Sequence, residues 1–140
     1  MCLFRQWLIL CAFALAGAGL TAAWVERPAA DKIGMERARR FARVLWVDAR
    51  PEAEYASGHV SGAVSLNEDN WSRAIAGVLA RWNPGDAVVV YCGGAECGAS
   101  KAVAVRLRGA EYGLEDVYVL RGGWEAWKAG GGEVREGGAR

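Results

Sequence analysis

Histidine is almost absent from this sequence, and neither sign of charge is in excess. The 140 residues include one histidine, His59, and 17 Lys+Arg stand against 16 Asp+Glu. Cys92 and Cys97 have a C-x4-C spacing, whereas most structural zinc sites use C-x2-C, so the chain lacks a zinc ligand set. Balanced charge provides no general attraction for nucleic acid. We therefore expect no metal, no cofactor and no nucleic-acid partner.

Cysteine and proline are also scarce. The chain has three prolines and four cysteines, and two of these cysteines, Cys2 and Cys11, lie in an apolar N-terminus. The two remaining cysteines are too few to form a disulfide framework. The 19 glycines follow no period, which excludes collagen-like and solenoid folds. A hydrophobic fraction of 53% argues against disorder, and the length suits one domain.

One long hydrophobic run is present, within an N-terminal segment over residues 1–27. Residues 7–25 carry no charge, and as a helix they would span about 28 Å, close to the thickness of a bilayer core. We expect a single-pass membrane anchor. The alternative is a signal peptide cleaved near "LTAA", with export to the periplasm or outside. Basic residues after the segment favour a cytoplasmic domain and a signal-like start favours export, so the side stays open.

The rest of the chain alternates between two kinds of pattern. We expect a linker over 28–32, a globular domain over 33–129 and a flexible Gly-rich tail over 130–140. Short apolar runs predict strands, and amphipathic stretches predict helices. The strands are expected at 44–48, 87–91 and 115–120, and the helices at 33–44, 51–57, 68–82, 100–110 and 122–130. This alternation predicts an α/β fold with a central parallel sheet flanked by helices on both faces, preceded by one N-terminal hydrophobic helix.

Three predicted strands end at candidate functional residues. The carboxyl ends of parallel strands meet at one edge of the sheet, where ligands bind in such folds. That edge would bring together Asp48 with Arg50, Cys92, and Arg121. The strand over 87–91 is the most apolar and is expected at the centre of the sheet.

Cys92 stands between this strand and a predicted helix. Backbone N–H groups and the helix dipole would favour its thiolate there, and glycines let the loop curl into an anion nest. This loop, which the resemblance described below implies is the active-site loop, comprises Gly93, Gly94, Ala95, Glu96 and Gly98. The alternative is a buried structural cysteine, since free cysteine packs as a small hydrophobe.

Four stretches occur together in the order of a known family: "LWVDAR", "EAEYASGHVSGAVSLN", "VVVYCGG" and "VYVLRGGWEAW". In them the sequence resembles the single-domain rhodanese-like sulfurtransferases, over about residues 33–129. The resemblance implies a persulfide on Cys92 that takes sulfur from thiosulfate or another sulfane donor and passes it to a thiol or other nucleophile. It also implies that Asp48 and Arg50 match the acid and base after the first strand, and His59 the histidine of a G-H-x-x-G-A turn.

The loop departs from the family pattern. It is longer than usual, holds no Arg or Lys, and contains Glu96. Arg50, Lys101 and Arg121 are expected to supply positive charge for an anionic donor. Gly98 stands where a phosphatase of this fold would need an arginine to clamp phosphate, which argues against that activity.

Cys97 adds a second thiol to the loop. It could resolve the persulfide, releasing reduced sulfur and leaving a disulfide for a thioredoxin-like reductant, or it could simply pack at the helix start. Two other functions stay open: a thiol/disulfide redox protein using Cys92 and Cys97, and a membrane-tethered non-enzymatic binding module. The expected partners are a small sulfur donor, a thiol acceptor and the membrane.

Supporting roles follow from local patterns. Asp48 is expected to accept hydrogen bonds from the loop or Arg50, or to cap the helix after Pro51. His59 is expected to be structural, and Ser100 to be the N-cap of the helix after the loop. Trp124 and Trp127 are expected to cover the sheet.

Overall fold

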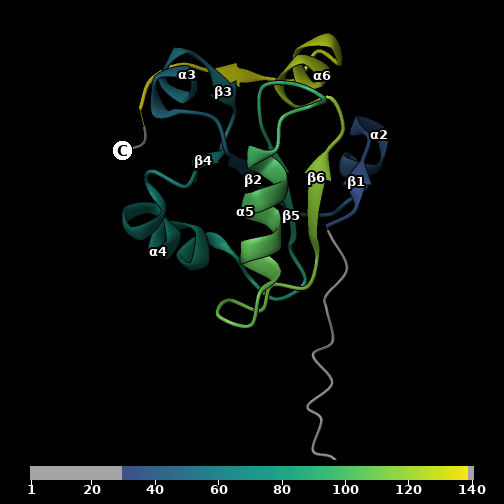
Figure 1. Cartoon of the computed structure of the whole chain (residues 1–140). Helices are drawn as coiled ribbons and strands as arrows, with labels where there is room; N and C mark the ends of the chain where they lie inside the picture. Colours follow the sequence, from purple (N-terminus) through teal and green to yellow (C-terminus); the bar gives the residue numbers. More distant parts are fainter. Residues whose placement is uncertain (1–29, 139–140) are drawn as a thin grey trace, which may run out of the picture.

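The computed structural model describes residues 30–138 (Figure 1). The predicted hydrophobic segment over 1–27, with its anchor or signal peptide, lies outside the described residues, as do residues 28 and 29 of the predicted linker. Within residues 30–138, no helix combines the length and apolar character needed to cross a bilayer.

A five-stranded parallel sheet forms the centre of the fold, in the order β1-β6-β5-β2-β4. Its strands are β1 (Lys32–Ile33), β2 (Val44–Asp48), β4 (Val64–Ser65), β5 (Ala87–Tyr91) and β6 (Val117–Leu120). Every residue of β5 is buried, as expected of a central strand with near-continuous apolar character. The predicted parallel sheet and the central position of residues 87–91 are confirmed.

Helices cover both faces of this sheet, as predicted. They are α2 (Met35–Ala38), α3 (Glu52–Ser57), α4 (Trp71–Arg81), α5 (Ala99–Arg108) and α6 (Gly123–Ala129). Alternation along β5 divides the core, because Val88 and Val90 face one way while Val89 and Tyr91 face the other. In Figure 1, α5 lies in front of the sheet, with α4 beside it.

The two cores have different composition. The core under α4 and α5 is mainly aliphatic and includes Leu107 and Cys92. The opposite core, under α2, α3 and α6, contains Tyr55 and Tyr91, with Trp124 and Trp127 packed against it. The two tryptophans therefore cover the sheet, as predicted.

The N-terminal boundary of the domain differs from the prediction. Residues 32–33 were assigned to the linker and the start of a helix, but they form β1, which pairs with β6 in register Lys32↔Val119 and Ile33↔Leu120. The helix expected over 33–44 is only α2, four residues long. The apolar spacing of the stretch reflects contacts of an edge strand and a single helical turn with the sheet.

The predicted flexible tail is also wrong over most of its length. β7 (Val134–Arg135) pairs antiparallel with β3 (His59–Val60) to form a second, two-stranded sheet. The Ser61 amide donates to the carbonyl of Glu133 at 3.1 Å, and the Gly137 amide to that of Ala56 at 2.8 Å. Long-range backbone pairing orders a segment whose glycines give no local sign of structure.

Candidate active site

The loop after β5 is held against the start of α6. The Trp124 amide donates to the carbonyl of Cys92 at 2.7 Å, and the Glu125 amide to that of Gly93 at 3.4 Å. Gly123 makes this approach feasible: it has φ +53°, and a Cβ there would lie 2.2 Å from the carbonyl oxygen of Cys92. Only glycine combines a left-handed backbone with so close a contact. The position of Cys92 is thus set by both β5 and α6.

Cys92 lies inside the protein and is 2% exposed. Its Sγ lies 3.2 Å from the Ser100 hydroxyl, 3.6 Å from the carbonyl oxygen of Cys97 and 3.8 Å from that of Gly94. Burial raises the pKa of the Cys92 thiol, and a hydrogen bond with Cys97 adds to the rise. The Ser100 hydroxyl and amide oppose it. The surroundings of Cys92 thus raise the pKa of its thiol, whereas the sequence pattern predicted a lowered one.

Cys97 has the opposite character. It is exposed, and although burial tends to raise its pKa, hydrogen bonds lower it overall. The hydrogen-bonding groups are the Cys92 side chain and the backbone of Ala99, Ser100 and Gly93. Hydrogen bonding thus lowers the pKa of Cys97, whereas the sequence pattern predicted a lowered pKa at Cys92. Both cysteines are free thiols, and the Cys92 sulfur lies 3.6 Å from the backbone carbonyl oxygen of Cys97.

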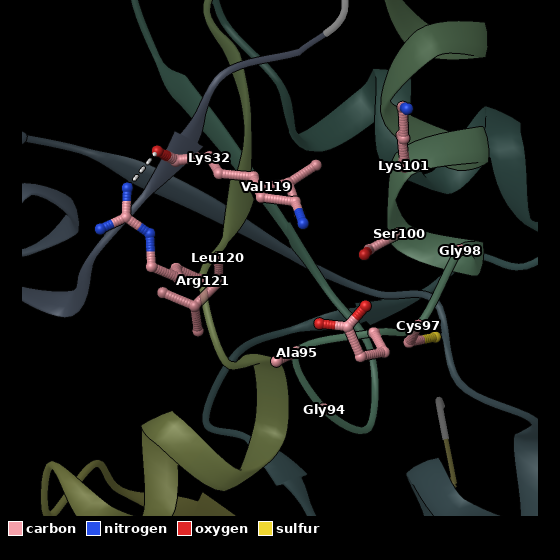
Figure 2. A pocket seen from close by; sticks show the side chains of 11 residues that line it. Lys32, Gly94, Ala95, Cys97, Gly98, Ser100, Lys101, Val119, Leu120 and Arg121 are labelled. Atoms are coloured by element: carbon pink, nitrogen blue, oxygen red, sulfur yellow. Dashed lines mark hydrogen bonds between the residues drawn. The ribbon is translucent and has the colours of Figure 1, made fainter.

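A cavity of about 150 Å³ opens beside this loop, between β6 and α5 (Figure 2). Its lining includes Cys97 and Ser100 but not Cys92. Three cations and one carboxylate border it: Lys32, Lys101, Arg121 and Glu96. Figure 2 shows the Lys32 side chain extending from β1 towards α5, while the Arg121 guanidinium turns away to donate to the Lys32 carbonyl at 3.4 Å.

Asp48 and Arg50 form a buried ion pair away from this cavity. Arg50 donates to both carboxylate oxygens of Asp48, at 2.7–3.2 Å, and to the carbonyl of Gly58 at 2.6 Å. Its guanidinium lies 4.4 Å from the centroid of the Trp124 ring. Burial disfavours the charge, but hydrogen bonding and attraction to Asp48 raise the pKa of Arg50 overall.

Arg50 was expected to supply positive charge for an anionic donor, but its guanidinium is paired with Asp48 and does not border the cavity. Asp48 accepts hydrogen bonds from Arg50, which is one of the two roles expected for it from the sequence. It is not the cap of α3, because Pro51 occupies that position without a side-chain hydrogen bond. The pair therefore braces the end of β2 against the turn at Gly58.

His59 is structural in its contacts, as expected. Its Nδ1 lies 2.9 Å from the carbonyl oxygen of Tyr55, and its ring stacks on the Tyr55 ring at 3.9 Å between centroids. Both residues are buried, and neither borders the cavity beside the loop. Within residues 30–138, no three His, Cys, Asp or Glu side chains gather as metal ligands would.

The sequence interpretation missed two site residues. Ser100 was expected as an N-cap, but α5 begins at Ala99 after Gly98, and the Ser100 hydroxyl reaches Cys92 from the first turn. Its place eight residues after Cys92, at the start of a helix, could have suggested this contact. Lys32 was missed because β1 was not predicted, and no local signal marks that strand.

A profile of the rhodanese-like domain family matches residues 32–130. The chain belongs to the rhodanese-like domain family. The match agrees closely with the domain predicted over 33–129, and the resemblance drawn from the sequence motifs is confirmed at this level. No match was found among curated proteins.

Solved structures show the same fold. The rhodanese-like domain of the Alr3790 protein from Anabaena sp. is 25% identical, with a TM-score of 0.57, covering 75% of this chain and 78% of that one. The BH2092 protein from Bacillus halodurans is 18% identical, with a TM-score of 0.59, covering 95% and 83%. A thiosulfate sulfurtransferase from Pseudomonas aeruginosa is 22% identical, with a TM-score of 0.60, covering 79% of this chain but 20% of that chain. The rhodanese-like family thus includes sulfurtransferases.

Proposed function

We propose that this rhodanese-like protein is a sulfurtransferase that holds sulfane sulfur as a persulfide on Cys92 and passes it on to a thiol. The observation that carries the proposal is the environment of the Cys92 sulfur at the end of β5. Ser100 offers both its hydroxyl, at 3.2 Å, and its amide to that sulfur. A persulfide is more acidic than its parent thiol and carries its charge on the outer sulfur, one bond beyond Sγ, so polar groups at this strand end favour the loaded anion.

A second function is favoured by one contact. The Cys92 sulfur lies 3.6 Å from the carbonyl oxygen of Cys97, and both cysteines are free, so a disulfide between these neighbouring thiols is the alternative chemistry of the loop. A thiol/disulfide redox protein would use this pair without any sulfur donor, and a thioredoxin-like protein would then serve as its reductant.

Sulfur loading separates the two functions. The reduced full-length protein is incubated with thiosulfate and, separately, with polysulfide, freed of donor, and measured by intact mass and peptide mapping. We expect a gain of one sulfur atom, located on Cys92, and its release to an added thiol. The Cys92→Ser/Cys97→Ser double variant serves as the control, because any sulfur it gains is held by Cys2 or Cys11 and is subtracted from the gain of the wild type. Absence of sulfur gain with both donors, together with a reversible Cys92–Cys97 disulfide, would establish the redox function instead.

A further inference from the structure

The two thiols of the loop differ in what can reach them. Cys92 is 2% exposed and does not border the cavity, whereas Cys97 is exposed and borders it. Of the two cysteines, therefore, only Cys97 is both exposed to solvent and part of the cavity wall, so a donor can reach it without opening the core. The carbonyl of Cys92 is held by α6, so the loop cannot easily turn Cys92 outward.

We propose that Cys97 is the exchange thiol of this site: sulfur enters and leaves through Cys97, and Cys92 holds it between the two events. This inference rests on the proposed sulfurtransferase function and adds a role for the second cysteine. Cys97 is suited to react with the donor because it is exposed and borders the cavity, and because hydrogen bonding lowers its pKa although burial tends to raise it.

Charge around the cavity fits an anionic donor. Lys32 and Lys101 outnumber the single carboxylate of Glu96, while the guanidinium of Arg121 turns away from the cavity. Lys32 extends into the space between β6 and α5 where a donor would lie (Figure 2). Thiosulfate and polysulfides are anions, so this excess of positive charge raises their local concentration near Cys97.

The transfer balances without an oxidant. In the first step, the Cys97 thiolate attacks the outer sulfur of the donor; a new S–S bond forms, the donor S–S bond breaks, and sulfite or a shorter polysulfide leaves with the electron pair. In the second step, Cys92 attacks the outer sulfur of the Cys97 persulfide. The S–S bond at Cys97 breaks as the bond at Cys92 forms, and the proton of the Cys92 thiol passes to the Cys97 sulfur that leaves. Delivery to an acceptor thiol is the reverse sequence.

Loading rates test the assignment. The full-length wild type, Cys97→Ser and Cys92→Ser are mixed with thiosulfate or polysulfide, quenched at intervals and measured by intact mass. We expect Cys97→Ser to load at least tenfold more slowly than the wild type. Cys92→Ser should load at close to the wild-type rate with its sulfur on Cys97, and lose it faster to an added thiol. Val105→Ser, an exposed change on the same helix, should match the wild type.

Two results would overturn the assignment while leaving the sulfurtransferase function intact. One is a Cys97→Ser variant that loads at the wild-type rate, and the other is a Cys92→Ser variant that gains no sulfur. If the wild type itself gains no sulfur with both donors, the proposed function fails and this inference fails with it.

Alkylation supplies a readout that a packing role for Cys97 would not change. The rate of iodoacetamide labelling follows the thiolate fraction, so it rises with pH and levels off above the pKa of the thiol. In the wild type, with the two labelled peptides separated after cleavage at Glu96, Cys97, with a lowered pKa, should reach its plateau at lower pH than Cys92, whose pKa burial raises. Profiles in the reverse order would contradict the exchange role.

Discussion

At the scale of single residues, the ion pair of Asp48 and Arg50 is almost wholly removed from water. The side chains are 0% and 4% exposed. Removing one partner of such a pair leaves the other charge buried and uncompensated, which typically costs about 3–5 kcal/mol. We therefore expect Arg50→Met to lower the free energy of unfolding by about that amount, measured by urea denaturation of the full-length protein.

A surface pair on the same protein provides the control. Arg40 and Glu36 lie 3.6 Å apart with side chains 78% and 91% exposed, so their ion pair contributes little. Arg40→Met should change the free energy of unfolding by less than about 1 kcal/mol. Equal effects of Arg50→Met and Arg40→Met would mean that the buried pair has no special structural role.

Ser100 is the residue whose predicted role changed most. Its hydroxyl lies 3.2 Å from Cys92 Sγ, and a hydrogen bond to a charged group contributes about 1.5–3 kcal/mol. Ser100→Ala should therefore slow sulfur transfer to an acceptor thiol roughly tenfold or more, since each 1.4 kcal/mol corresponds to about a factor of ten. Ser57→Ala removes a hydroxyl that bonds only the Glu54 carbonyl on an exposed helix, and serves as the matched control. A Ser100→Ala variant with unchanged transfer would show that the contact is only packing.

The site could be predicted from the sequence only in part. Cys92 at a strand end, with a nest-forming loop after it, follows from the order of apolar and glycine residues. The sequence does not reveal which of the two thiols has the lowered pKa, because that depends on the path of the loop between Gly93 and Gly98. The isolation of Arg50 from the cavity likewise depends on its tertiary contacts with Gly58 and Trp124.

At the scale of elements, the contact between α6 and the loop depends on Gly123. An alanine there would adopt a left-handed backbone, at about 1–2 kcal/mol, and its Cβ would collide with the carbonyl of Cys92. We expect Gly123→Ala to displace α6, lower the free energy of unfolding by more than that amount, and expose Cys92 to iodoacetamide. The measurements are urea denaturation and the labelling rate of Cys92 in a Cys97→Ser background.

Gly77 in α4 provides the opposite case. A Cβ at Gly77 meets nothing within 4 Å, and the residue is in a helix interior. Gly77→Ala should stabilise the protein by up to about 1 kcal/mol, because alanine favours helix over glycine by that amount. If both alanine variants behaved alike, the close approach at Gly123 would have no energetic consequence.

Elements with strong periodicity were predicted well, and short ones were not. β2, β5 and β6 are four or five residues of mainly apolar sequence, and α3, α5 and α6 have clear starts and stops. β1 and β7 are two residues each, too short to display a period of two. β1 forms because it pairs with β6, and β7 forms because it pairs with β3. These pairings join segments far apart in the sequence, so the local sequence of β1 or β7 does not predict them.

At the scale of the whole molecule, the C-terminal segment is connected to the active site through two strands. β7 pairs with β3, and the Val60 amide of β3 donates to the hydroxyl of Tyr91 at 3.0 Å. Tyr91 immediately precedes Cys92, and burial together with the charge of Asp48 raises the pKa of its hydroxyl, so the hydroxyl stays neutral. β7 therefore stabilises β3, and β3 in turn contacts the end of β5 immediately before Cys92.

Truncation after Gly132 tests this connection. It removes β7, the Ser61–Glu133 and Ala56–Gly137 backbone bonds, and the bond from Trp127 Nε1 to the Glu133 carbonyl at 3.1 Å. Each such bond has a net value of about 0.5–1.5 kcal/mol, partly replaced by water at this surface, so we expect a loss of about 1–3 kcal/mol. The Val60 amide should exchange with solvent faster as β3 loosens. Truncation after Gly137 keeps all three bonds and should leave the free energy of unfolding and the exchange rate of the Val60 amide unchanged. Equal effects of the two truncations would show that β7 does not stabilise β3 or its contact with Tyr91.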